Sequence, residues 1–263
     1  MARTKSATPV AFDDQGRGEP ALLCLPGWCV DRSAFRDLVP ACSRSRRTLA
    51  MDWRGHGDSD PAQGDFGESA LLEDALAVVR ESGIRRVVPV ALAHSGWVAI
   101  ELQRRLGERV PAIVLVDWLI LDPPPPFVSA LSALQDAEKW QTTRDQLFSM
   151  WLEGVDSAKV TRLVREVMGS YGVEMWARAG REIGAAYRRE GSPLKALAAL
   201  RPVTQVIHLY AQPADPGFLQ IQETFAAANP WFSVRRLNAK SHFPMLEVPE
   251  EMANAIESFV ARQ

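Results

Sequence analysis

The chain has 263 residues, of which 47% are hydrophobic and 24% are charged, values that are ordinary for a globular protein with a sizeable core. Its net charge of −2, with both signs interspersed, gives no basic surface for nucleic acid or for an anionic membrane. Cys24, Cys29 and Cys42 have no spacing typical of disulfides or metal sites, and the N-terminus lacks the apolar stretch of a signal peptide. We therefore expect a cytoplasmic protein without nucleic-acid or membrane partners; the sequence predicts no particular oligomeric state.

Short strands alternate with helices in the first part of the chain, from Pro20 to Trp118. The β-rich runs are ALLCLPG, RTLAMDW, RRVVPVALA and PAIVLVDWL. Apolar residues recur at helical spacing in ESALLEDALAVVRES and GWVAIELQRRLGE. This alternation predicts right-handed crossovers and a mostly parallel sheet flanked by helices, which is an α/β fold.

A proline run, LDPPPPF at 121–127, interrupts this alternation, because consecutive prolines continue neither a helix nor a central strand. The periodicity is then helical from Val128 to about Leu200, after which come a strand, a helix, a strand and a closing helix: PVTQVIHLYAQP, FLQIQETFAAANP, FSVRRLNA and PEEMANAIESFVARQ. We predict an α/β core at 1–120 and 201–263. A helical cap at 121–200, inserted between the sixth and seventh strands, is expected over the carboxyl ends of the strands.

The segment VVPVALAHSGWVAIEL predicts a strand, a tight turn and a helix, an arrangement that resembles the nucleophile elbow of the α/β-hydrolases. That turn needs small residues two positions before and after its apex. An apex at Ala93 satisfies this with Ala91 and Ser95, but alanine has no nucleophilic atom. An apex at Ser95 would place Trp97 where only a small side chain fits. The turn is therefore either an elbow without its serine or a different structure.

The four histidines have different settings. His208 lies inside a predicted buried strand, which favours a core histidine, and His56 lies in a turn rich in Gly and Asp, which favours a structural role. His94 follows the elbow apex, where the backbone N–H points into an oxyanion hole, and the role of its side chain stays open. His242 lies on the loop between the last strand and the last helix, and we predict that it is a catalytic base.

A histidine base needs a carboxylate to fix its tautomer, and two aspartates follow predicted strands. Asp215 lies among turn-forming residues that leave it solvated, whereas Asp117 follows four apolar strand residues and would be costly to bury without a partner. We therefore favour Asp117 as the partner of His242. The LPGWC turn after the first clear strand is expected to supply a second oxyanion N–H, from Trp28.

Several segments resemble a known family: LLCLPGWCVD, DWRGHGDSDP, PVALAHSGWV, VDWL, FSMWLEG, MWARAGR, GSP, NPWFS and SHFP. They are similar to segments of the cofactor-independent 3-hydroxy-4-oxoquinoline and 3-hydroxy-4-oxoquinaldine 2,4-dioxygenases of the α/β-hydrolase fold. The resemblance runs from about Pro20 to the C-terminus, and its tryptophan-containing segments are far more specific than generic hydrolase turns.

The resemblance implies a role for each site residue. His242 would remove the proton of the substrate's 3-hydroxyl group with Asp117 as its partner, and Trp28 and His94 would line the oxyanion site. In the cap, Trp151 would pack on the substrate ring, with a place in the helix-face core as the alternative. The resemblance also implies that Trp176, in the segment MWARAGR, is a substrate-binding residue.

Three positions depart from the family pattern. Ala93 stands where the family has the elbow serine, and Val30 and Leu92 stand where it has histidines. Each exchange replaces a polar group with an apolar one, which favours hydrocarbon over a polar ring substituent. We therefore expect a substrate with an alkyl chain at C2, such as the heptyl-hydroxyquinolone signal.

The resemblance implies a reaction of the substrate anion with O2 that releases carbon monoxide and an N-acylanthranilate and uses no cofactor. The sequence has no metal-ligand cluster and no Gly-rich nucleotide fingerprint. The residues alone indicate a base, an acid partner and an oxyanion pocket. Two alternatives stay open: a serine-type esterase or amidase whose nucleophile is replaced by Ala93, and a non-catalytic ligand-binding protein of the hydrolase fold.

Overall fold

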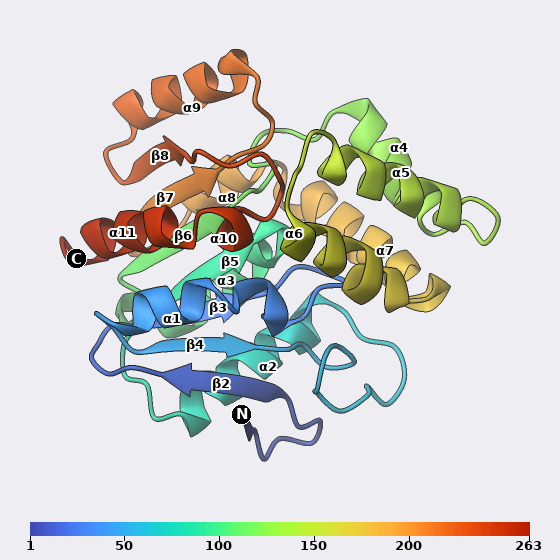
Figure 1. Ribbon diagram of the computed structural model, residues 1–263. Coiled ribbons are helices and arrows are strands. Elements are labelled where there is room, and N and C mark those ends of the chain that lie inside the picture. The colour runs from blue at the N-terminus through green and yellow to red at the C-terminus, as the bar shows by residue number, and fades with distance from the viewer.

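The computed structural model describes all residues from Met1 to Gln263 and has an eight-stranded sheet at its centre (Figure 1). The strand order is β1-β2-β4-β3-β5-β6-β7-β8. The pairs β1–β2 and β2–β4 are antiparallel, and the remaining neighbours are parallel. The strands are β1 (Ala2–Arg3), β2 (Ala11–Gln15), β3 (Ala21–Leu25), β4 (Thr48–Met51), β5 (Val87–Leu92), β6 (Ala112–Val116), β7 (Gln205–Tyr210) and β8 (Phe232–Arg236).

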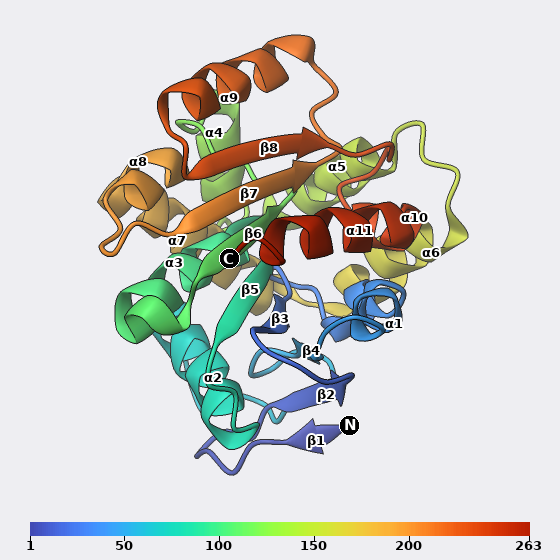
Figure 2. The same cartoon turned by 90° about the vertical axis from the view of Figure 1, so that its left-hand side faces the viewer.

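Helices cover both faces of the sheet. In Figure 2, α2 and α3 lie on one side of the strands and α1 and α11 on the other. None of the helices is both long and apolar enough to cross a lipid bilayer. Their bounds, outside the β6–β7 segment, are α1 (Leu38–Ser43), α2 (Glu68–Glu81), α3 (Gly96–Leu106), α9 (Pro216–Ala228), α10 (Pro244–Glu247) and α11 (Pro249–Val260).

The chain between β6 and β7 is helical, and its residues 125–190 lie beyond the carboxyl ends of the strands (Figure 1). One hydrophobic cluster joins residues of this segment, such as Phe148 and Trp176, to the apolar strands of the sheet, so the two parts share a core. The helices here are α4 (Pro125–Ala133), α5 (Trp140–Leu152), α6 (Ala158–Arg162), a π-helical turn (Leu163–Val167), α7 (Val173–Glu190) and α8 (Pro193–Ala198).

The α/β-hydrolase fold predicted from the sequence is confirmed, and the structure adds to or differs from the local expectations at three places. The antiparallel strands β1 and β2 were not predicted, because neither contains an extended apolar run. The proline run does not only interrupt the pattern: it begins α4, since proline is tolerated in the first helical turn, where N–H groups lack intrahelical acceptors. The expected helix VSALSALQDAEKW ends at Ala133, and a new helix begins at Trp140.

A close approach between α3 and the end of β6 depends on Gly96. A Cβ atom at this position would overlap the ring of Trp118, which is only 2% exposed and packs edge-on against Trp97 with ring centroids 4.9 Å apart. The glycine therefore makes room for the indole that follows Asp117.

We predict that Gly96→Ala lowers the free energy of unfolding by about 1–3 kcal/mol, because the enclosed indole has no free space into which it can move. Urea unfolding followed by far-UV circular dichroism measures this. Gly169→Ala is the matched control, since a Cβ there meets its neighbours at 3.8 Å, an ordinary contact distance. Equal stabilities for the two variants would contradict the close approach.

Candidate active site

Backbone strain is concentrated at the carboxyl edge of the sheet. The non-glycine residues with positive φ are Cys29 (59°), which follows β3, Ala93 (49°), which follows β5, and Asp117 (46°), which follows β6. An L-residue rarely adopts this conformation, and it persists where the surroundings enforce it, most often at functional sites. Three neighbouring strands therefore end in strained turns around one place.

Ala93 occupies the apex of the elbow between β5 and α3. Its positive φ is the strained conformation that such a turn imposes, and Ser95 lies beyond the apex. The Ser95 hydroxyl donates to the carbonyl oxygens of Leu25 and Leu92, both at 2.9 Å, so it ties the elbow to β3. The turn therefore has the geometry of a nucleophile elbow, with a methyl group at its apex.

His242 and Asp117 lie together although 125 positions separate them in the sequence. Nδ1 of His242 is 3.0 Å from Oδ1 of Asp117, while Oδ2 accepts from the backbone N–H groups of Ala211 at 2.7 Å and Gln212 at 3.3 Å. Asp117 is 3% exposed, so these donors offset the cost of burying its charge. Asp215, the alternative partner, instead caps α9 through the N–H of Gly217.

One further contact positions the His242 imidazole, and another holds its loop. The ring of Trp151, from α5, stacks on it with a centroid distance of 5.3 Å and an interplanar angle of 9°. The loop that carries His242 is closed by Glu247, whose Oε1 accepts from the backbone N–H of Ser241 at 2.7 Å. The Trp151 side chain therefore contacts the His242 ring itself, in addition to the cavity beside it.

A cavity of about 710 Å³ opens beside this pair, within the size range of sites for drug-sized ligands. Ala93, His94, Asp117, Trp151 and His242 all line it, so the structure brings five of the predicted site residues together. The sequence did not single out its other lining residues, which are Trp118, Leu119, Phe127, Leu147, Met150, Glu153, Gly154, Gln212, Pro213, Ala214, Ala211, Arg236, Ala239 and Lys240. Trp118, adjacent to Asp117 in the segment VDWL, had a signal in the sequence; the apolar cap residues had only helical periodicity.

Four predicted site residues do not line this cavity. Leu92 and Val30 are 1% and 2% exposed and belong to the hydrophobic core, so they give the cavity none of its apolar surface. Trp176 is 3% exposed and packs against Phe148, on the core side of α5. Trp28 stacks on Phe66 with a centroid distance of 5.8 Å and lines a separate, water-sized cavity of about 10 Å³ that also touches His94.

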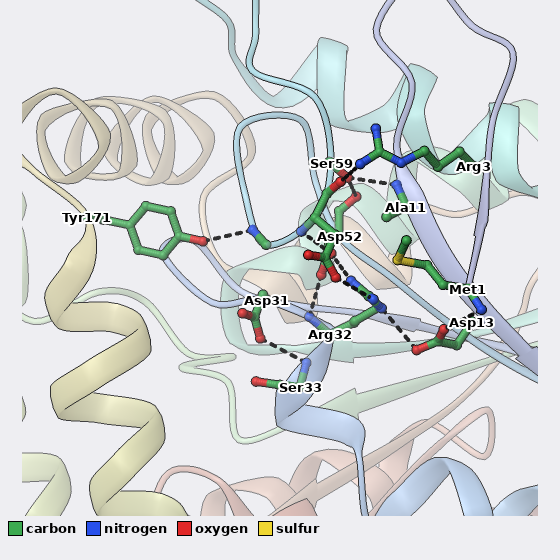
Figure 3. Close-up of polar contacts among 12 residues, drawn as sticks. Met1, Arg3, Ala11, Asp13, Asp31, Arg32, Ser33, Asp52, Ser59 and Tyr171 are labelled. Carbon is green, nitrogen blue, oxygen red and sulfur yellow. Dashed lines mark hydrogen bonds and ion pairs between the residues drawn. The ribbon is translucent and has the colours of Figure 1, made fainter.

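A network of charges around Asp52 holds the loop that carries Trp28 and Cys29; Figure 3 shows Asp52 with Arg32 and Asp13. Arg32 forms ion pairs with Asp52, Asp13 and Asp58, and its backbone N–H donates to Asp52 at 2.7 Å. Asp52 is fully buried, so it fixes the loop after β3 against the loop after β4. His56, predicted to be structural, adds a second tie, because its Nε2 accepts from the N–H of Cys29 at 3.1 Å.

Known proteins match nearly the whole chain. The sequence profile of the alpha/beta hydrolase family matches residues 22–255. The chain is 38% identical over 253 residues to a 2-heptyl-3-hydroxy-4(1H)-quinolone dioxygenase of Mycobacteroides abscessus, covering 95% of this chain and 94% of that protein. It is 38% identical over 242 residues to a 1H-3-hydroxy-4-oxoquinoline 2,4-dioxygenase of Pseudomonas putida, covering 92% and 91%. The chain belongs to the alpha/beta hydrolase family, in its 3-hydroxy-4-quinolone 2,4-dioxygenase group.

Solved structures of this dioxygenase group superpose closely on the protein. AqdC, described in connection with recognition and ring cleavage of the Pseudomonas quinolone signal, gives a TM-score of 0.94 at 37% identity, with 100% of both chains covered. The structure of 1H-3-hydroxy-4-oxoquinoline 2,4-dioxygenase gives 0.94 at 36%, with 99% and 100% covered. The resemblance inferred from the tryptophan-containing segments is therefore confirmed.

Three histidines of this dioxygenase-group protein are kept neutral, mainly by burial. Burial lowers the pKa of His56 and of His208 to about 4, and burial together with the nearby His242 lowers the pKa of His94 to about 3. His208 is a core histidine, as its place in the β7 sequence predicted. It is fully buried, Nε2 accepts from the backbone N–H of Trp118 at 3.2 Å, and Nδ1 lies 2.6 Å from Oε1 of Gln222.

We predict that His208→Gln removes part of the acid sensitivity of folding. Below pH 6.5 the unfolded chain binds a proton at His208 and the native state does not. The contribution of the neutral His208 to the free energy of unfolding is therefore fully present above pH 6.5 and is lost as the pH falls toward 4. The difference in free energy of unfolding between wild type and variant should narrow by about 1.4 kcal/mol per pH unit in this window. Urea titrations from pH 7 to 4.5 measure it; a difference that stays constant would show that His208 is protonated in the native state.

Proposed function

We propose that the protein cleaves the heterocyclic ring of a 3-hydroxy-4(1H)-quinolone with O2, without a metal or organic cofactor, and releases an N-acylanthranilate and carbon monoxide. The observation that carries this proposal is the His242–Asp117 pair beside a large cavity with only a methyl group at the elbow apex. Such a site can remove a proton, but Ala93 offers no oxygen for an acyl-enzyme. The names of the relatives favour this reaction over a serine-type hydrolase and over a non-catalytic binding protein.

The reaction begins with proton removal. Because the Asp117 carboxylate only accepts, the proton of a neutral His242 lies on Nδ1 and the lone pair on Nε2 receives the proton of the substrate's 3-hydroxyl group. Asp117 then offsets the imidazolium charge, while its Oδ2 accepts from two backbone N–H groups. The base is therefore prepared before the substrate binds.

The electron-rich anion of the substrate is the reductant for O2. A C2 peroxide attacks the C4 carbonyl, and the backbone N–H group of His94, a residue that lines the cavity, stabilises the oxyanion that develops there. The O–O, C2–C3 and C3–C4 bonds then break: C3 leaves as carbon monoxide, and one oxygen atom of O2 stays on C2 and one on C4. The proton held by His242 is released to solvent, and the product leaves as a carboxylate.

The side chain at C2 is an alkyl chain. Phe127, Leu147 and Met150 give the cavity an apolar wall on its cap side, and the cavity volume exceeds what a bicyclic ring fills. The relatives named 2-heptyl-3-hydroxy-4-quinolone dioxygenases support the same choice. This apolar wall replaces the argument from Val30 and Leu92, whose side chains lie in the core.

The partners are the small aromatic substrate and O2, and the setting is the cytoplasm. All three cysteines are free and buried, which suits a reducing compartment. An alkylquinolone signal taken up by the cell would be degraded there, so the reaction serves quinolone degradation and quorum quenching.

We predict that His242→Ala lowers kcat at least 100-fold with 2-heptyl-3-hydroxy-4-quinolone, because no other lone pair replaces Nε2 at the 3-hydroxyl group. Oxygen uptake and trapped carbon monoxide, measured in parallel on metal-free protein, should be stoichiometric in the wild type and be lost together in the variant. Oxygen uptake by the wild type without carbon monoxide would contradict the ring-cleaving reaction.

Asp117→Asn should also reduce kcat, by about 100-fold or more, because an amide neither stabilises the imidazolium nor fixes the Nδ1–H tautomer. Asp215→Asn is the matched control, and its kcat should stay within twofold of the wild type because Asp215 only caps α9. Steady-state oxygen uptake compares the two variants. A larger loss in the Asp215 variant would identify the wrong acid.

A further inference from the structure

Two cationic residues line the large cavity without a charged partner. Arg236 and Lys240 both contribute to its lining, and neither side chain forms an ion pair or a hydrogen bond within the protein. Arg235, the neighbour of Arg236 on β8, instead contacts Glu251 at 3.4 Å and does not line the cavity. Two unpaired cations on one cavity give that part of it a positive potential. The reaction described above leaves both without a function.

The side chains of the two cations are exposed, but the backbone beneath them is fixed. Arg236 ends β8, where it pairs with Tyr210 of β7. The carbonyl oxygen of Lys240 accepts from the side-chain amide of Gln212 at 2.6 Å, and its backbone N–H donates to Oε2 of Glu247 at 3.3 Å. The end of the sheet and the loop before the catalytic base therefore hold both residues at an exposed edge of the cavity.

The other charges on the cavity are negative. Asp117 is buried and pairs with His242, so this pair carries a negative charge whenever the imidazole is neutral. Glu153, which follows α5, is exposed and has no ion pair. The cavity therefore has a negative charge beside the base and another on its cap side, and its positive charges come only from β8 and the loop that follows it.

The proposed reaction changes the charge of the ligand. A 3-hydroxy-4-quinolone enters as a neutral molecule. Ring cleavage turns C4 into the carboxylate of an N-acylanthranilate, and the 3-hydroxyl proton passes through His242 to solvent. Once His242 is neutral again, the new carboxylate shares the cavity with the carboxylate of Asp117, and like charges repel more strongly in a partly desolvated site than in water. An anion formed here is stabilised by moving toward Arg236 and Lys240.

We propose that Arg236 and Lys240 form a carboxylate-binding site at the exposed edge of the cavity, which holds the N-acylanthranilate product by its carboxylate while the acyl chain lies against the apolar wall of the cap. The inference rests on the function proposed above and deepens it. A guanidinium group binds a carboxylate through two parallel N–H donors, and an ammonium group adds a compact charge. An amphiphile with an anionic head and an alkyl chain matches both sides of this cavity.

The product is therefore expected to compete with its own substrate. The neutral quinolone gains nothing from the two cations, whereas the acylanthranilate gains their attraction. Because both side chains are exposed, dissolved salt screens this attraction, so the affinity for the product should fall as the ionic strength rises. A neutral molecule of the same shape should show no such dependence.

The charge of the ligand is tested by isothermal titration calorimetry of the wild-type protein at neutral pH. N-octanoylanthranilate, the product expected from a 2-heptyl substrate, is compared with the benzamide that has a carboxamide in place of the carboxylate. At low salt the anion should bind several-fold more tightly than the amide, and only the anion should lose affinity at high salt. Equal Kd values for the two ligands at low salt would overturn the inference.

The residues are tested with Arg236→Gln and Lys240→Gln. Each should raise the Kd of N-octanoylanthranilate about threefold, and the double variant about tenfold, since each removes one exposed charge pair. The Kd of the neutral benzamide should stay within twofold. Arg235→Gln is the matched control, because it removes a neighbouring cation that does not line the cavity. Effects in the two cavity variants no larger than in this control would contradict the site.

A charge of the opposite sign gives a second test. Glu153→Gln removes a negative charge from the same cavity, so it should lower the Kd of N-octanoylanthranilate and leave that of the benzamide unchanged. A rise in the Kd of the anion would show that the potential at the cavity edge is not set by these residues, and would overturn the inference.

These outcomes separate the inference from the proposed function, because binding of the acylanthranilate is measured without turnover. Wild-type protein that cleaves the quinolone but binds the acylanthranilate and the benzamide equally well would overturn the inference alone. Wild-type protein that neither consumes oxygen nor releases carbon monoxide with the quinolone would overturn the proposed function and, with it, the assignment of this site to a reaction product.

Discussion

The buried carboxylate of Asp117 is the group on which the site depends. A carboxylate that is 3% exposed needs hydrogen-bond donors, and here they come from two distant parts of the chain. Ala211 and Gln212 fix the segment after β7, and His242 fixes the loop before α10. Satisfying one carboxylate therefore brings the ends of β6 and β7 and the last loop to the same point.

The next residue, Trp118, serves the other half of the site. Its backbone N–H donates to His208 and its indole N–H donates to His94, whereas the preceding residue, Asp117, contacts His242. Two consecutive residues after β6 therefore contact three histidines. The positive φ of Asp117 turns the chain so that these two side chains point to different partners. The strain at this one residue is offset by the hydrogen bonds that it makes possible.

Particular residues show which features of the fold and of the site could be predicted from the sequence. The pairing of Asp117 with His242, the elbow at Ala93 and the core position of His208 were all predicted, because each depends on the order of strands and on the cost of burying a polar group. Four residues expected at the substrate site do not line the cavity: Trp28, Val30, Leu92 and Trp176. A family pattern gives a residue's place along a strand or helix, but which way its side chain points depends on the register and rotation of that element against its neighbours. The apolar wall from Phe127, Leu147 and Met150 was missed for the same reason.

The sequence by itself determined the α/β-hydrolase fold, the family and the missing nucleophile, since these follow from the alternation of elements and from local turn chemistry. The sequence favoured Asp117 as the partner of His242, but only the tertiary structure decided which groups surround the other three histidines. The partner of an imidazole nitrogen is a matter of about 3 Å between residues that are far apart in the sequence, as the 24 positions between His94 and Trp118 illustrate. Whether a ring nitrogen donates or accepts a proton depends on the group at that distance.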